Sequence, residues 1–269
     1  MKILISQMKP YLGNVEKNLQ KIISYTEEGI KEKCDIVVFP ELSLNGTLLE
    51  DLIYETAVLK VPEKLLELSR EITVIFGAVK EENNKYYNCA FCLEDGKVIG
   101  EHKKVFLSKS NGGSEARYFT RGKNIKTFKS KNGILGITLG EEGFNPLVNG
   151  VLSADGAEII FNLINESAVS SEENSLYETA SIAGSLYNKN FAVTVNRVGT
   201  EDGVVFAGGS FAVSPYGKII EKIEKFNEKL SIINVELKDI KKAYCISEYD
   251  NENNLEIIKK ELERVMEKN

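Results

Sequence analysis

The chain is poor in histidine, since His102 is the only one among its 269 residues. Metal sites built from several histidines are therefore excluded, and any histidine-dependent triad would have to use this residue. Residues 136–140 resemble the G-x-S-x-G turn of such hydrolases, with Thr138 as nucleophile. That turn has its histidine later in the chain, whereas His102 comes earlier. We interpret the match as chance, and we predict no metal and no other cofactor.

Cysteine is also scarce, with four residues in the whole chain. This number does not indicate a disulfide framework in a protein of this size. Cys89 and Cys92 have the C-x-x-C spacing of redox and metal sites, but they lie in an expected strand, where residues three apart point to opposite faces. We therefore predict that both are small core residues.

Two further absences concern location and partners. The apolar run Ile3–Ile5 is too short for a secretory or membrane-spanning segment, so we expect a cytoplasmic protein without membrane contact. The chain also lacks an excess of cations, because 34 Lys and Arg stand against 40 Asp and Glu and give a net charge of -6. Nucleic-acid binding depends on clustered Lys and Arg, so we expect no nucleic-acid partner.

Apolar strands alternate with amphipathic helices along the chain. Residues 35–39 are continuously apolar, which is typical of a strand buried on both faces, and the turns at 94–96 and 132–133 predict hairpins. The capping box Ser170-x-x-Glu173 predicts a helix start. The expected strands are 2–8, 35–39, 73–79, 86–93, 97–106, the hairpin 127–139, 158–164, 191–196, 206–214, 218–223 and 230–237, and the expected helices are 15–30, 62–72, 146–154, 170–188 and 255–266. No linker interrupts this order, so we predict one α/β domain over residues 1–269, with two stacked sheets and outer helices.

Polar residues follow several of these apolar strands. Glu41 comes just after strand 35–39, at the position where α/β proteins usually keep polar function. Lys104 lies near the end of a hairpin strand, and an inward lysine needs a carboxylate partner because an unpaired buried charge is costly. We therefore expect Lys104 to point into the same space as Glu41. Residues 134–139 form a further strand, and it leads into an acidic, glycine-rich bend at Gly140.

Four segments, in this order, resemble the nitrilase, or carbon–nitrogen hydrolase, superfamily: VFPEL at 38–42, KKVFL at 103–107, SEARYF at 114–119 and VNRVGTEDGVVFAGGSF at 195–211. The resemblance covers nearly the whole chain and is greatest to the glutaminase domains of glutamine-dependent NAD synthetases. It implies a four-layer α-β-β-α sandwich in which a Glu, a Lys and a Cys hydrolyse amides or nitriles. By this resemblance Glu41 is the general base, Lys104 stabilises the tetrahedral intermediate, and Glu115 is a supporting carboxylate. A plain buried ion pair is the alternative for Glu41 and Lys104.

The family's nucleophile is the residue that this chain lacks. The cysteine belongs to a pattern like G-x-x-x-C-E-D, whereas residues 136–142 read GITLGEE and place Gly140 at the cysteine position. Glycine cannot form an acyl-enzyme, and loss of a nucleophile typically removes about a million-fold in rate. We therefore predict an impaired hydrolase-like protein with a pocket for a small amide or carboxylate. The alternatives are an amidohydrolase in which Glu41 activates water, and a purely structural protein.

The resemblance also implies a homodimer or higher homo-oligomer that pairs through its outer helices. Residues 1–269 contain no ATP-dependent synthetase domain beside the glutaminase-like one. If the protein handles ammonia, we expect it to do so for a separate chain.

Overall fold

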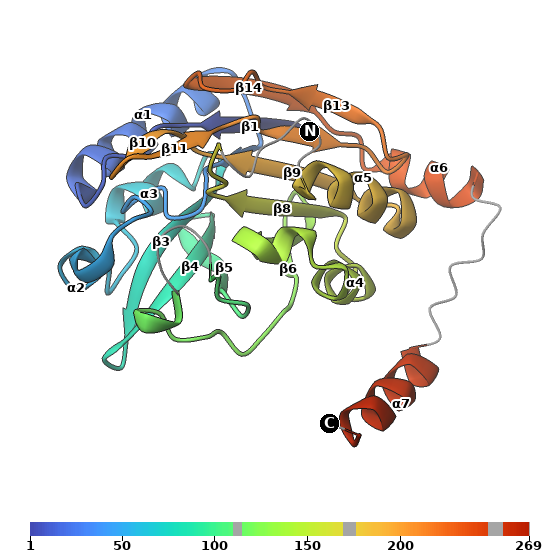
Figure 1. Cartoon of the computed structure of the whole chain (residues 1–269). Helices are drawn as coiled ribbons and strands as arrows, with labels where there is room; N and C mark the ends of the chain where they lie inside the picture. Colours follow the sequence, from blue (N-terminus) through green and yellow to red (C-terminus); the bar gives the residue numbers. More distant parts are fainter. Residues whose placement is uncertain (110–114, 169–175, 247–254, 269) are drawn as a thin grey trace.

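The computed structural model describes residues 1–109, 115–168, 176–246 and 255–268. Two mixed β-sheets form its centre (Figure 1). The first has the spatial order β14 (Lys229–Asn234), β1 (Lys2–Gln7), β2 (Ile36–Val38), β3 (Thr73–Glu82), β4 (Lys85–Glu94) and β5 (Lys97–Lys103). The second has the order β13 (Ile219–Lys222), β12 (Phe211–Val213), β9 (Phe191–Asn196), β8 (Ile159–Ile164), β7 (Gly133–Leu139) and β6 (Phe128–Ser130). A separate ribbon pairs β10 (Val198–Glu201) with β11 (Val204–Ala207).

Side chains of β1 divide between two cores because successive residues of a strand point to opposite faces. Ile3 and Ile5 face the second sheet and belong to the same apolar cluster as Phe161 of β8. Leu4 faces the other way, in a cluster covered by α1 (Val15–Lys31) and α3 (Glu63–Leu68). The first sheet therefore lies between a helical layer and the second sheet.

The outer side of the second sheet carries α4 (Pro146–Ala154) and α5 (Leu176–Asn188) (Figure 1). Leu152 of α4 packs against Ile160 of β8, and Tyr177 of α5 joins a cluster with Ala192 of β9. The layers are α-β-β-α, so the predicted fold class is confirmed. The remaining helices are α2 (Ile53–Thr56), α6 (Lys238–Ile246) and α7 (Leu255–Met266).

The central strands run parallel, and this direction places the candidate site. β1, β2 and β3 are parallel neighbours in the first sheet, as are β7, β8 and β9 in the second. The carboxyl ends of parallel neighbours meet at one sheet edge, where α/β proteins bind ligands. Glu41 follows β2, Gly140 follows β7 and Glu166 follows β8.

The prediction of one continuous strand over residues 206–214 is wrong. β11 ends at Ala207 and pairs with β10 around a turn at residues 202–203, and β12 begins only at Phe211. Gly208 and Gly209 have φ angles of +70° and +73°, which glycine adopts readily and which end the strand. Residues 206–207 therefore end the β10–β11 hairpin, and residues 211–213 form the separate strand β12.

Other boundaries are shorter than expected. The helix predicted over 62–72 ends at Leu68, and the strand predicted over 97–106 ends at Lys103. The capping box Ser170-x-x-Glu173 lies outside the described residues, which resume at the start of α5. No helix in the described ranges is long and apolar enough to cross a bilayer.

The two cysteines of the C-x-x-C match lie on opposite faces of β4, as predicted. Cys89 belongs to the outer core under α1, and Cys92 belongs to the core between the sheets. Burial raises the pKa of both thiols, so neither is a ready nucleophile or metal ligand.

Candidate active site

Gly140 lies at the end of a buried strand, and a side chain at this position would point at charged side chains. β7 is buried from Leu135 to Leu139 and continues into a 3-10 turn over Gly140–Phe144. Gly140 has a φ of +53°, a conformation in which a Cβ is strained. A Cβ built there would lie 2.5 Å from Lys104 Nζ and 3.1 Å from Glu41 Oε2. The Lys104 ammonium therefore occupies the space that a side chain at position 140 would need.

Three predicted site residues meet at this bend. Lys104 Nζ lies 2.9 Å from Glu41 Oε1 and 2.9 Å from Glu115 Oε2. The side chains of Glu41 and Lys104 are buried, and that of Glu115 is 16% exposed. Asn88 of β4 donates to Glu41 Oε1 over 2.7 Å and, over 3.2 Å, to Glu115 Oε1. Both carboxylates are thus held on one ammonium and one amide.

Glu41 keeps one oxygen free of these bonds. Within the described chain, no donor hydrogen-bonds to Glu41 Oε2, and a Cβ built at position 140 would lie 3.1 Å from Oε2 and 3.2 Å from Oε1. Burial raises the pKa of Glu41 to about 7, although the charge of Lys104 opposes this shift. Burial also disfavours the charged form of Lys104, but its two carboxylate partners outweigh it and raise the pKa of Lys104. A permanent cation therefore lies beside a carboxyl group that titrates near neutral pH, as acid–base catalysis requires.

Glu142 holds the backbone on both sides of the Lys104–Gly140 contact. Its Oε1 accepts from the amides of Val105 (2.6 Å) and Phe106 (3.2 Å), which follow Lys104. Its Oε2 accepts from the amide of Leu139 at 3.0 Å and lies 2.7 Å from His102 Nε2. These hydrogen bonds offset the burial of Glu142 and lower its pKa. One ionised carboxylate thus joins the loop after β5 to the end of β7.

Glu142→Gln is expected to destabilise the fold by about 2–3 kcal/mol, because an amide cannot accept all of these bonds in a buried position. The neighbouring Glu141→Gln is the matched control, since Glu141 accepts from the Ser108 hydroxyl at a partly buried position, and we expect it to cost less than about 1 kcal/mol. Urea denaturation measures both. Equal losses would show that Glu142 has no special part in holding the bend.

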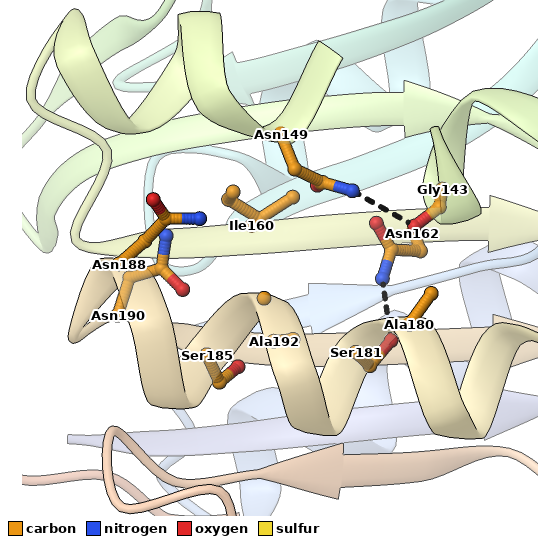
Figure 2. Close-up of a pocket in the computed structure, with 11 residues that line it drawn as sticks. Gly143, Asn149, Ile160, Asn162, Ala180, Ser181, Ser185, Asn188, Asn190 and Ala192 are labelled. Carbon is orange, nitrogen blue, oxygen red and sulfur yellow. Dashed lines mark hydrogen bonds between the residues drawn. The ribbon is translucent and has the colours of Figure 1, made fainter. Parts of the chain in front are cut away.

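A small polar cavity lies behind the bend, away from Glu41 and Lys104. Figure 2 shows side chains of α4, α5 and β8 around it, with Asn149 donating to the carbonyl of Gly143 and Asn162 donating to Ser181. Asn162 also accepts from Thr138, two residues before Gly140. The side chains around the cavity therefore hold the bend in place. The buried Thr138 hydroxyl donates to Asn162 and is not free to act as a nucleophile, which is consistent with a chance match to the nucleophile turn.

Sequence reasoning missed Asn88 and Glu142 as parts of this site. Asn88 is a polar residue in the apolar half of β4, which is a signal that could have been read. Glu142 was visible inside the motif, but its role depends on contacts with distant segments. Among the described residues, no group of three or more His, Cys, Asp or Glu could hold a metal ion.

The sequence profile of one family, described as carbon–nitrogen hydrolase, matches residues 2–244. The chain belongs to the carbon–nitrogen hydrolase family. The profile covers every strand of both sheets and each of the residues Glu41, Lys104, Glu115 and Gly140. The predicted superfamily is thus confirmed.

Among curated carbon–nitrogen hydrolase relatives, the glutamine-dependent NAD(+) synthetase of Aquifex aeolicus is 29% identical over 250 residues, which cover 90% of this chain and 43% of that protein. A probable nitrilase of Schizosaccharomyces pombe is 26% identical over 248 residues, covering 87% of this chain and 88% of that one. The chain therefore spans less than half the length of the synthetase, and nearly all of the nitrilase.

Solved structures show the same fold. The glutamine-dependent NAD+ synthetase from Acinetobacter baumannii, in complex with ADP, has a TM-score of 0.75 at 26% identity and covers 86% of this chain and 44% of its own. A carbon–nitrogen hydrolase from Helicobacter pylori G27 has a TM-score of 0.82 at 19% identity, covering 97% and 98%. An amidase from Nesterenkonia sp. AN1, in which acrylamide has added to the active-site cysteine, has a TM-score of 0.81 at 18% identity, covering 97% and 99%. The last two support the fold alone.

Proposed function

We propose that this carbon–nitrogen hydrolase binds a small amide or carboxylate at Gly140 and is catalytically impaired, because the nucleophile position has no side chain. The observation that carries the proposal is the direction of position 140, whose Cβ would point at Lys104 and Glu41. A thiol there would lie beside a base and a cation, the arrangement that covalent amide hydrolysis uses. In our proposal Glu41 is the former base, Lys104 the oxyanion partner and Glu115 the supporting carboxylate.

Covalent hydrolysis needs a group that attacks the carbonyl carbon and is later displaced by water. Gly140 has no side-chain atom that could attack the carbonyl carbon and form the acyl-enzyme. Glu41 and Lys104 are therefore left to bind and polarise an amide. Binding and oxyanion groups alone retain only part of an enzyme's acceleration.

A second candidate function is direct hydrolysis by water. Glu41 Oε2 has no partner among the described residues, and the pKa of Glu41 is raised to about 7. Glu41 would take a proton from water while the hydroxide attacks the carbonyl carbon, and Lys104 would stabilise the oxyanion. The C–N bond would then break as the amine leaves with the proton from Glu41. Such a rate would rise as pH passes through about 7, because the base must be ionised.

Ammonia release from glutamine and simple amides distinguishes the two functions. We expect the unmodified protein to release no more ammonia than a heat-killed sample, because covalent catalysis is unavailable. Glu41→Gln is the control, and it should behave like the unmodified protein. Multiple turnovers that disappear in Glu41→Gln would reject the impaired function and support activation of water by Glu41.

We further propose a cytoplasmic protein that forms a homodimer or higher homo-oligomer through its outer helices, and we keep residues 1–269 as one domain. Support comes from exposed apolar residues on two outer helices. Leu147 and Val151 of α4 are 66% and 47% exposed, and Leu186 of α5 is 49% exposed. Leu147 and Val151 are four residues apart and share one face of α4, and exposed apolar side chains of this kind are typical of a subunit interface. A separate synthetase chain stays a possible recipient only if ammonia is released.

Sedimentation velocity at micromolar concentration tests the dimer. We expect a species of twice the 30.0 kDa chain mass, and Leu147→Glu should shift it to monomer by placing a charge in the interface. Leu59→Glu is the matched control, because Leu59 is 71% exposed and lies outside α4 and α5. A concentration-independent monomer for the unmodified protein would reject the dimer.

A further inference from the structure

A groove runs along the edge of the first sheet, at β5. Its volume is about 300 Å³. Residues 98–101 and Lys103 of β5 form one wall, and Lys123, Lys126 and Phe128 belong to the segment that forms the other. None of the candidate active-site residues described above lines this groove. It is therefore a separate feature of the molecule.

The main chain of β5 presents hydrogen-bonding groups to this groove. β5 is the last strand of the first sheet, and among the described strands its only neighbour is β4. The Lys104 amide donates to the Asn88 carbonyl over 2.9 Å, and hydrogen-bonded and non-hydrogen-bonded pairs alternate from there. Glu101, opposite Phe91, is thus in a non-hydrogen-bonded pair. Its N–H and C=O point away from β4, toward the groove.

The side chains of the groove are mainly basic, although the whole chain has a net charge of -6. Lys123 and Lys126 are exposed, and no carboxylate of the described residues forms an ion pair with either. Glu101 is the acidic side chain of the lining, and Lys80 pairs with it over 2.6 Å. Two cations are thus left for an anionic partner.

We propose that this groove binds an extended acidic peptide of a partner protein, which pairs with β5 and adds a strand to the first sheet. Main-chain bonds to Glu101 hold the peptide, and its carboxylates pair with Lys123 and Lys126. Successive side chains of a strand alternate between faces, so acidic residues at every second position all point the same way.

Two other occupants fit the groove less well. A small anion would use the lysines but not the outward main chain of β5. A second copy of β5 would place lysines of both copies side by side, which is how edge strands usually avoid pairing with one another. An acidic strand uses both the charge and the main chain.

Fluorescence anisotropy with a labelled pentapeptide, Glu-Val-Glu-Val-Glu, blocked at both ends, tests the proposal. We expect binding at 50 mM salt that weakens at least about fivefold at 500 mM, because the lysines are exposed. The peptide Glu-Glu-Glu-Val-Val has the same composition without the alternation, and we expect it to bind at least about threefold more weakly. Lys-Val-Lys-Val-Lys should not bind.

Glu101→Pro tests the added strand separately from the charge. Proline has no N–H, and an N–H that faces away from β4 can be removed without breaking the ladder. We expect this variant to bind at least about fivefold more weakly than Glu101→Gln, the matched control, which removes only the carboxylate. In the unmodified protein, the peptide should also slow hydrogen exchange of the Glu101 amide, a readout that does not depend on folding of the proline variant.

The lysines are tested by combining Lys123→Glu with Lys126→Glu, which should abolish binding of the acidic peptide. Lys129→Glu is the matched control and should leave binding unchanged, because Lys129 is exposed on β6 but does not line the groove.

Equal binding of the two glutamate peptides would overturn the proposal, and so would an unchanged exchange rate of the Glu101 amide. Equal binding by folded Glu101→Pro and Glu101→Gln would also overturn it. Displacement of the peptide by an equal concentration of inorganic phosphate would reduce the groove to a simple anion site and reject the added strand.

Discussion

Lys104→Met is expected to destabilise the protein by about 3–5 kcal/mol, the usual cost of removing one partner from a buried ion pair. Lys104 is 2% exposed and contacts Glu41 and Glu115, so its loss leaves two carboxylates next to each other without a cation. The loss should be larger at pH 8 than at pH 5. Lys104 lowers the pKa of Glu41, and without it Glu41 takes up a proton more readily as pH falls.

Lys103→Met is the matched control for this substitution. Lys103 is the adjacent lysine, but its side chain is 22% exposed and its partner Glu82 is 39% exposed. An exposed ion pair contributes less than about 1 kcal/mol. Combining Lys104→Met with Glu41→Gln should recover part of the lost stability, because one of the unpaired charges is removed. Equal losses of stability for the two lysine substitutions would mean that the buried Lys104 ion pair contributes no more than an exposed one.

Gly140→Cys is expected to create a thiol that reacts with iodoacetamide faster than an ordinary cysteine. The new side chain would point at Lys104, whose charge favours the thiolate and lowers the thiol pKa below the usual value of about 8.5. Lys104 Nζ must move, because the new Cβ would otherwise lie 2.5 Å from it. The left-handed backbone adds a cost of about 1 kcal/mol, so we expect a folded, slightly less stable protein with weak amidase activity.

The other cysteines supply internal controls for the labelling rate. Cys245 is exposed and should react at an ordinary rate, whereas Cys34, Cys89 and Cys92 are buried and should be inert. Gly140→Ala has the same backbone cost without a thiol, so it isolates the stability effect. Peptide mapping against time gives the rate at each position. A folded Gly140→Cys protein whose new thiol reacts no faster than Cys245 would remove the main support for a former nucleophile position.

The fold could be read from the sequence where the pattern was local and regular. The apolar run before Glu41 and the hairpin turns led to the sandwich, since strand periodicity fixes which side chains are buried. The strand 206–214 could not be read correctly, because nothing in an apolar run decides whether Gly208 and Gly209 continue a strand or turn it. That outcome depends on the pairing of β10 with β11.

The site could be predicted in part for a related reason. Glu41, Lys104 and Glu115 fall in motifs, so the resemblance located them before their contacts were known. Asn88 and Glu142 act by joining segments distant in sequence, such as the loop after Lys104 and the strand before Gly140. A pattern along one strand does not contain such contacts.

The central claim is that no acyl-enzyme forms in this chain because position 140 lacks a side chain. Intact-mass spectrometry on acid-quenched samples incubated with p-nitrophenyl acetate, followed by peptide mapping, tests it most directly. We expect no acyl adduct on the peptides containing Glu41 or Gly140 in the unmodified protein, and an adduct at position 140 in the Gly140→Cys variant. An acyl adduct on either of these peptides in the unmodified protein would contradict the account.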